Sequence, residues 1–227
     1  MKFVGWEEPL GKPEDVLLVM ELCDGGSLQH RIDSTTSGLP GREALEILRQ
    51  IASALEYLHS RGQFHSDVKP RNILLRSLNP LHAVLGDCAD IKDVRSIPRD
   101  RPRGTPAYLS PEILRLNRCC GTMDDMWALG ITMLGMVGQW PQMEFTQEGL
   151  KKYPKKCHDH VKKLVELNPG DEIVEGLLAG LVEWDSNRRM DAVKCRRMAV
   201  ELRDSGRWNT EKVKLKVPDE FKPISFW

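Results

Sequence analysis

The sequence predicts a mainly α-helical fold of the α+β class, and three observations support this prediction. Long stretches repeat apolar residues at the three- and four-residue spacing of an amphipathic helix. Only a few short apolar runs rich in Val, Leu and Ile have the length of strands. These strand-like runs lie in the first half of the chain, and the second half is mostly helical in pattern.

The first half begins with the run "DVLLVMELC", from Asp15 to Cys23, which lies between "GKPED" and "DGGS". A short apolar run bounded by turn residues predicts a buried strand. From Leu39 to Arg61 the apolar residues follow helical spacing, and Gly62 ends the pattern, so we expect a long amphipathic helix there. The next runs, "NILLR" and "HAVLGD", are candidate strands too close together for an intervening helix.

The second half begins with a proline- and arginine-rich stretch from Ile91 to Pro111, which indicates an extended loop. From Asp124 onward we expect helices that are broken at "PKKCHDH" and at "NPGD". The apolar run "MWALGITMLGMVG" is too short to span a bilayer and predicts a buried helix. Cys157, His158 and His160 offer metal-ligand types, but they crowd into one short stretch, so a solvated loop is the favoured interpretation.

Composition gives no sign of an unusual partner. Of the 227 residues, 41% are hydrophobic and 29% are charged, and the formal net charge is zero. Nothing global therefore suggests a nucleic-acid or membrane partner. The six cysteines are scattered without a CxxC pair, which is typical of reduced thiols in a cytoplasmic or nuclear protein.

One polar stretch, "QFHSDVKPRNILL", asks for a chemical explanation. Asp67 lies at a helix-to-strand junction, where a carboxylate can face a cleft, and Lys69 can hold an anion beside it. Asn72 and Asp87, which ends the next strand, offer oxygens to a hard cation such as Mg²⁺. A base, a lysine and two metal-binding oxygens suit phosphoryl transfer, in which catalysis is mostly positioning and charge neutralisation.

At these residues the sequence resembles the eukaryotic protein kinase family. "HSDVKPRNILL" is similar to the catalytic loop H-R-D-x-K-x-x-N, and "GDCA" occupies the place of D-F-G. "GTPAYLSPEIL" resembles the end of the activation segment, "DMWALG" the buried central helix, and "WDSNRR" a late family motif. All five occur in family order and at family-like spacing.

The resemblance implies a domain organisation and a set of catalytic roles. Residues 1–26 would be a remnant of small-lobe strands and hinge, residues 27–206 the large lobe, and residues 207–227 a tail. Asp67 would be the catalytic base, Lys69 would contact the transferring phosphate, and Asn72 and Asp87 would hold Mg²⁺. The lysine after Asp67 and the threonine of "GTP" resemble serine/threonine kinases, so ATP and a protein substrate are implied.

Further residues receive structural or nucleotide-binding roles from the same resemblance. Met20 would be the gatekeeper, and Glu21 and Cys23 would offer hinge backbone groups to adenine. Ser27 would also lie at the cofactor. Structural roles would fall to His65, which links the loop to the Asp87 region, to Asp125, which bonds the loop backbone, and to a buried ion pair of Glu112 with Arg189.

The chain also departs from the family pattern. No G-x-G-x-x-G loop, strand lysine or helix glutamate precedes the expected hinge, and Ser66 replaces the arginine before the catalytic aspartate. Each lost charged contact removes about 1.5–3 kcal/mol, so we expect weak nucleotide binding and trace activity from these residues alone. Three hypotheses stay open: a truncated serine/threonine kinase, a single-lobe pseudokinase that binds proteins, and a fragment whose partner chain supplies the small lobe.

Overall fold

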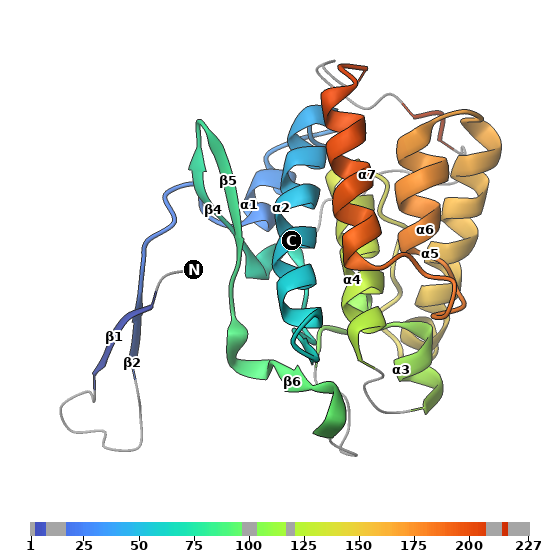
Figure 1. Ribbon diagram of the computed structural model, residues 1–227. Helices are drawn as coiled ribbons and strands as arrows, with labels where there is room; N and C mark the ends of the chain where they lie inside the picture. The colour runs from blue at the N-terminus through green and yellow to red at the C-terminus, as the bar shows by residue number, and fades with distance from the viewer. Residues whose placement is uncertain (1–2, 8–16, 97–103, 117–120, 208–214, 218–227) are drawn as a thin grey trace.

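The structure is a computed structural model that describes residues 3–7, 17–96, 104–116, 121–207 and 215–217. In this part of the chain, α-helices form the main body, and short strand pairs lie along one side of it (Figure 1). The helices are α1 (Leu28–Asp33), α2 (Gly41–His59), α3 (Pro111–Leu116), α4 (Thr122–Met136), α5 (Gln147–Leu167), α6 (Ala179–Leu181) and α7 (Ala192–Asp204). A π-helical turn (Ile173–Leu178) leads into α6.

The strands pair two by two, and every pair is antiparallel. They are β1 (Phe3–Glu7) with β2 (Leu17–Met20), β3 (Gln63–Phe64) with β6 (Lys92–Asp93), and β4 (Ile73–Leu78) with β5 (Leu81–Leu85). The described residues form no larger sheet, so the prediction of a mainly helical fold with a few strands is confirmed. The β4–β5 pair matches the candidate strands "NILLR" and "HAVLGD".

The central helix α4 organises the core. It is buried from Asp124 to Met136, as expected for the apolar run in its sequence. Gly130 lies where α4 meets the end of α6, and a Cβ atom there would lie 2.8 Å from Cγ2 of Val182. A glycine is therefore needed for the close approach of these two segments.

The first expected strand is real, but the prediction that it is buried is wrong. β2 pairs only with β1, and Val19 and Met20 remain 40% and 46% exposed. Figure 1 shows the β1–β2 pair standing away from the helical body. An apolar run predicts a strand, but burial also needs a second layer, and none of the described elements covers this pair.

The prediction that the chain leaves the helix at "PKKCHDH" is also wrong. α5 continues through Pro154, although a proline inside a helix removes one backbone hydrogen bond. Tyr153, Cys157, Val161 and Leu164 recur at helical spacing and are buried against the core, and this burial outweighs the lost bond. The solvated loop expected at Cys157, His158 and His160 is therefore a helix in which Cys157 and His160 are buried.

Other expected boundaries agree to within a few residues. The helix expected from Leu39 to Arg61 is α2, Gly41–His59, and the break at "NPGD" separates α5 from the π-helical turn. Much of the expected loop from 91 to 111 is described, but residues 97–103 lie outside the described ranges. No described helix has both the length and the apolar composition needed to cross a bilayer.

Helices α2 and α7 lie side by side, and an ion pair between Glu46 of α2 and Arg203 of α7 connects them (Figure 1). Its carboxylate accepts hydrogen bonds from Arg203 of α7, from Arg49 and from Gln50, each with a donor–acceptor distance of 2.6 Å. Burial acts to raise the pKa of Glu46, but the hydrogen bonds from these three side chains outweigh it and lower the pKa to about 2. The ionised carboxylate therefore stabilises the folded state.

We predict that Glu46→Gln destabilises the fold in a pH-dependent way. Because the folded pKa lies below the ordinary value of 4.5, the ionic stabilisation is fully present above about pH 4.5 and is lost as pH falls towards 2. The difference in unfolding free energy between the parent and Glu46→Gln should therefore shrink between pH 5 and pH 3 in urea titrations. Glu201→Gln, at an exposed site on α7, is the control and should show no such trend. A pH-independent difference for Glu46→Gln would contradict this assignment.

Candidate active site

The polar loop between β3 and β4 is held from beneath by a buried histidine. His65 is fully buried, and its Nε2 lies 2.8 Å from the carbonyl oxygen of Gly86. Because a carbonyl only accepts, Nε2 carries the proton, and Nδ1 accepts the backbone N–H of Asp67 at 3.4 Å. His65 thus joins the loop to the segment before Asp87, as the resemblance implied.

The backbone of the same loop is anchored on the central helix. Asp125 is buried, and its carboxylate accepts the N–H of His65 at 2.7 Å and that of Ser66 at 2.8 Å. Nε2 of His59, at the end of α2, lies 3.0 Å from the same carboxylate. Ser66 has a φ of 67°, a conformation that is uncommon for residues other than glycine. The bonds to Asp125 help to hold it there.

Asp67 lies at the centre of a compact group of donors from Lys69, Asn72 and Thr105 (the Asp67 group). Nζ of Lys69 is 2.6 Å from its Oδ2, and Nδ2 of Asn72 is 3.0 Å from the same oxygen. Thr105, from a distant part of the chain, offers its N–H and its hydroxyl to Oδ1, both at 3.3 Å. Lys69 also donates to Oγ1 of Thr105 at 2.8 Å. The structure thus brings together Asp67, Lys69 and Asn72, which the sequence singled out as site residues.

The electrostatics of this group keep Asp67 ionised. Burial of the carboxyl acts to raise its pKa, and the hydrogen bond and charge of Lys69 act against it. The donors on Asn72 and Thr105 add to the effect of Lys69, so the pKa of Asp67 is lowered from its ordinary value. At neutral pH the carboxylate carries a full negative charge and can accept a proton or a hydrogen bond.

Asn72 and Asp87 emerge at the same end of the β4–β5 pair. Ile73 pairs with Leu85, and the N–H of Gly86 donates to the backbone oxygen of Asn72 at 2.7 Å. Both side-chain hydrogen bonds of Asn72 use its amide nitrogen, so neither uses the amide oxygen. Asp87 is exposed, with a φ of 55° and a ψ of 64°. Two such oxygen ligands fit Mg²⁺, which takes one or two protein oxygens together with phosphates and water.

The residues expected at the nucleotide base lie in the connection from β2 to α1. Glu21 forms an ion pair with Arg76 of β4, and Cys23 is a partly exposed free thiol. The hydroxyl of Ser27 accepts the N–H of His30 and so caps the short helix α1. Met20 ends β2 and is exposed. These side chains make no described contact with the Asp67 group.

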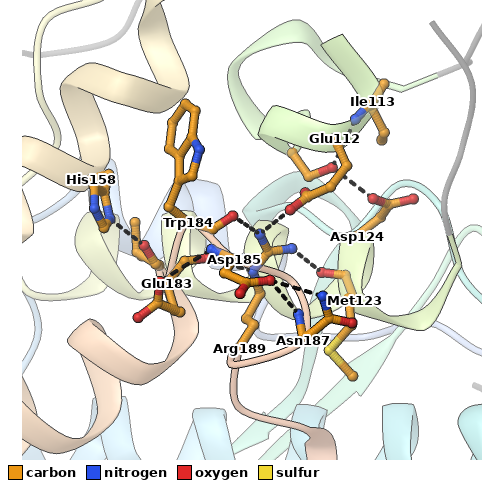
Figure 2. A network of polar contacts seen from close by, with 12 residues as sticks. Glu112, Ile113, Met123, Asp124, His158, Glu183, Trp184, Asp185, Asn187 and Arg189 are labelled. Carbon is orange, nitrogen blue, oxygen red and sulfur yellow. Dashed lines mark hydrogen bonds and ion pairs between the residues drawn. The ribbon is translucent and has the colours of Figure 1, made fainter. Parts of the chain in front are cut away.

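The ion pair expected between Glu112 and Arg189 is present and buried (Figure 2). Nη2 of Arg189 lies 2.8 Å from Oε1 of Glu112. The same guanidinium donates to the backbone oxygens of Glu183 and Met123, both at 2.9 Å. The guanidinium also lies over the ring of Trp127, 5.0 Å from its centroid. Arg189 therefore ties α3 and the start of α4 to the chain that precedes α7.

Two residues that matter to the site were not among the predicted site residues. Thr105 appeared in the sequence only as a family marker, yet it bonds both Asp67 and Lys69. His59 gave no signal beyond its place at the end of a helical pattern, yet it contacts Asp125. Neither contact is encoded locally, because the partners are 36 to 66 residues apart in the chain.

Comparison with known proteins now defines the class. The model of the protein kinase domain family matches residues 2–199, and the chain belongs to that family. Its helical body is the large lobe of a protein-kinase-like fold, and the described residues contribute little small-lobe sheet.

The curated relatives are protein kinases, and one of them is of the serine/threonine type by name. The human serine/threonine-protein kinase ULK3 is 32% identical over 182 residues, which are 78% of this chain and 37% of ULK3. The human hormonally up-regulated neu tumor-associated kinase is 35% identical over 208 residues, which are 88% of this chain and 27% of that kinase. The chain thus spans about a third of the length of the curated relatives that it matches.

Solved structures show the same fold. A crystal structure of the Rad53 kinase domain and SCD2 matches with a TM-score of 0.68 at 27% identity, covering 86% of this chain and 68% of that chain. A further structure of the same two parts in complex with AMPPNP matches with a TM-score of 0.63 at 27% identity, covering 80% of this chain and 67% of that chain. By these comparisons the chain belongs to the protein kinase domain family and resembles members of the serine/threonine type.

We predict that Arg189→Ala destabilises the fold by about 3–5 kcal/mol, because the substitution leaves the buried carboxylate of Glu112 without its cation. The neighbouring Arg188→Ala is the control: its side chain is 75% exposed and lies 3.8 Å from Glu183, so its loss should cost less than about 1 kcal/mol. Chemical denaturation of the two variants measures both costs. Equal stabilities for Arg189→Ala and Arg188→Ala would contradict the importance of the buried pair.

Proposed function

We propose that this chain transfers the terminal phosphoryl group of ATP to serine or threonine hydroxyls of a protein substrate. The observation that carries the proposal is the Asp67 group, in which an ionised carboxylate is positioned by Lys69, Asn72 and Thr105. In phosphoryl transfer most of the catalysis comes from such positioning and from charge neutralisation.

The chemistry of each side chain follows from its contacts. Asp67, with its lowered pKa, accepts the hydrogen bond of the substrate hydroxyl, orients it and takes up its proton. Lys69 holds a positive charge between Asp67 and Thr105, beside the place where a phosphate anion must arrive. Asn72 and Asp87 would hold Mg²⁺, which neutralises phosphate charge when bound.

Several findings support the cofactor and the setting that we infer. The neighbouring Rad53 kinase domain has been crystallised with AMPPNP, which supports nucleotide binding by this fold. The cysteines Cys23, Cys88, Cys157 and Cys195 are free thiols, which supports a cytoplasmic or nuclear setting. The serine/threonine kinase relative supports a protein substrate.

A second candidate function is a pseudokinase that acts as a protein-binding module. It is favoured by the absence of a G-x-G-x-x-G motif and of a strand lysine from the 227 residues, since these groups cradle and neutralise the phosphates. A partner chain that supplies them is the third possibility. For a protein made of these residues alone we therefore expect weak nucleotide binding and only trace transfer.

We predict that Asp67→Asn lowers phosphoryl transfer at least 100-fold, because the amide cannot take up the proton of the hydroxyl. A radiolabelled-ATP assay with a general protein substrate, run to long times, has the sensitivity needed for trace transfer. Asp204→Asn, an exposed acid-to-amide change at the end of α7, is the control and should leave the rate unchanged. Equal rates for the parent and Asp67→Asn would remove Asp67 from the mechanism.

We predict that Asp87→Asn weakens Mg²⁺-dependent nucleotide binding about tenfold or more, because one of the two proposed oxygen ligands loses its charge. Nucleotide binding without Mg²⁺ should stay as in the parent. Titration of the chain with ATP, with and without Mg²⁺, measures both quantities by calorimetry. A parent chain that binds no Mg²⁺–ATP at all would favour the pseudokinase.

A further inference from the structure

Helix α5 carries a basic groove that the proposed chemistry does not use. The groove is a hollow of about 500 Å³ on one face of the helix. The residues that line it are Lys152, Lys155, Lys156, Asp159, His160 and Lys163. They recur at three- and four-residue intervals, so their side chains form one continuous stripe along α5.

The groove carries an excess of positive charge, although two of its lysines are paired with carboxylates. Four lysines line it and only one carboxylate, that of Asp159. Burial, together with repulsion from Lys163, lowers the pKa of His160 to about 4, so this histidine is neutral at physiological pH. The whole chain has a formal net charge of zero, so the positive potential is a local feature of this surface.

The lysines of the groove are accessible to an incoming anion. Lys152 and Lys155 are 73% and 69% exposed. Each forms an ion pair with a residue one helical turn away, Glu148 and Asp159 respectively. Such exposed pairs contribute little to stability, so a ligand carboxylate can take the place of either partner.

A short chain of contacts connects the groove to the active site. Nζ of Lys156 donates to the backbone oxygen of Gln142 at 2.8 Å. Two residues earlier in the same segment, the ring of Trp140 packs edge-on against that of Tyr108, with the centroids 6.4 Å apart. Tyr108 lies in the turn that follows Thr105, the residue that bonds Asp67. A polypeptide bound in the groove therefore lies on a helix that is linked, through the segment of Gln142 and Trp140, to the turn that follows Thr105.

We propose that this groove docks an acidic, carboxylate-rich segment of the protein substrate, outside the residues that react. Lys152 and Lys163 are eleven positions apart in the helix, or about 16 Å, which matches about five extended residues. A nucleic acid or a membrane would require a larger basic surface than one helix face of a chain with no net charge. The proposal depends on the proposed function only in calling the partner a substrate.

Binding without nucleotide tests the groove separately from catalysis. A fluorescein-labelled peptide of six glutamates is titrated with the parent chain, with Lys152→Gln/Lys155→Gln, and with Lys151→Gln/Lys162→Gln. The last pair is the matched control, because it removes the same charge from exposed sites on α5 that do not line the groove. We expect the groove variant to bind about fivefold more weakly or worse, the control to bind like the parent, and all affinities to fall as salt is raised.

Further peptides in the same titration test which anion the groove accepts. A peptide with phosphoserines in place of glutamates tests the same anionic chemistry from a second source, and a neutral glutamine peptide should not bind. Equal losses in the groove variant and in the control, or no binding of the glutamate peptide at millimolar concentration, would overturn the proposal. Tighter, groove-dependent binding of a DNA oligonucleotide or of anionic vesicles would also overturn it.

The two proposals can fail separately. If the peptide still binds to a chain that shows no phosphoryl transfer, the groove remains a docking surface, but its partner is then not a substrate. If an active chain phosphorylates glutamate-rich and glutamine-rich substrates with the same KM, the catalytic assignment of Asp67 stands. The groove then has no role in docking the substrate.

Discussion

The position of the polar loop that carries Asp67 depends on one buried carboxylate, that of Asp125 on the central helix α4. It accepts the backbone N–H groups of His65 and Ser66 and contacts the ring of His59. Burying a charge costs several kcal/mol, and hydrogen bonds from three groups offset that cost only while all of them stay in place. These contacts hold the loop in the position from which Asp67 meets Lys69 and Thr105.

The ion pair of Glu112 with Arg189 works on the same principle in a second place. Its partners come from α3 and from the chain before α7, and the guanidinium also bonds two backbone oxygens and lies over Trp127 (Figure 2). Asp125 positions the loop of Asp67, and this pair holds the chain that follows Thr105. The active-site geometry thus follows from two buried charges, each surrounded by donors or by an opposite charge.

Two opposing effects of its surroundings set the pKa of Asp67. Burial favours the neutral acid, whereas the nearby ammonium and the donors favour the carboxylate, and the donors prevail. Asp87 has different surroundings: it is exposed, and its left-handed backbone conformation turns the chain after β5.

The periodicity of the sequence by itself determined the class of fold, and the resemblance of its motifs to the protein kinase family implied the polar loop that carries Asp67 and the Glu112–Arg189 pair. The sequence also predicted helix α2 and the β4–β5 pair, because the apolar patterns that indicate them are local. Only the tertiary structure decided burial: Val19 and Met20 of β2 are exposed because no element among the described residues covers them, and α5 passes through Pro154 because one face of the helix packs on the core. Contacts between distant residues, such as that of Thr105 with Asp67, depend on the path of the whole chain, and no local pattern records that path.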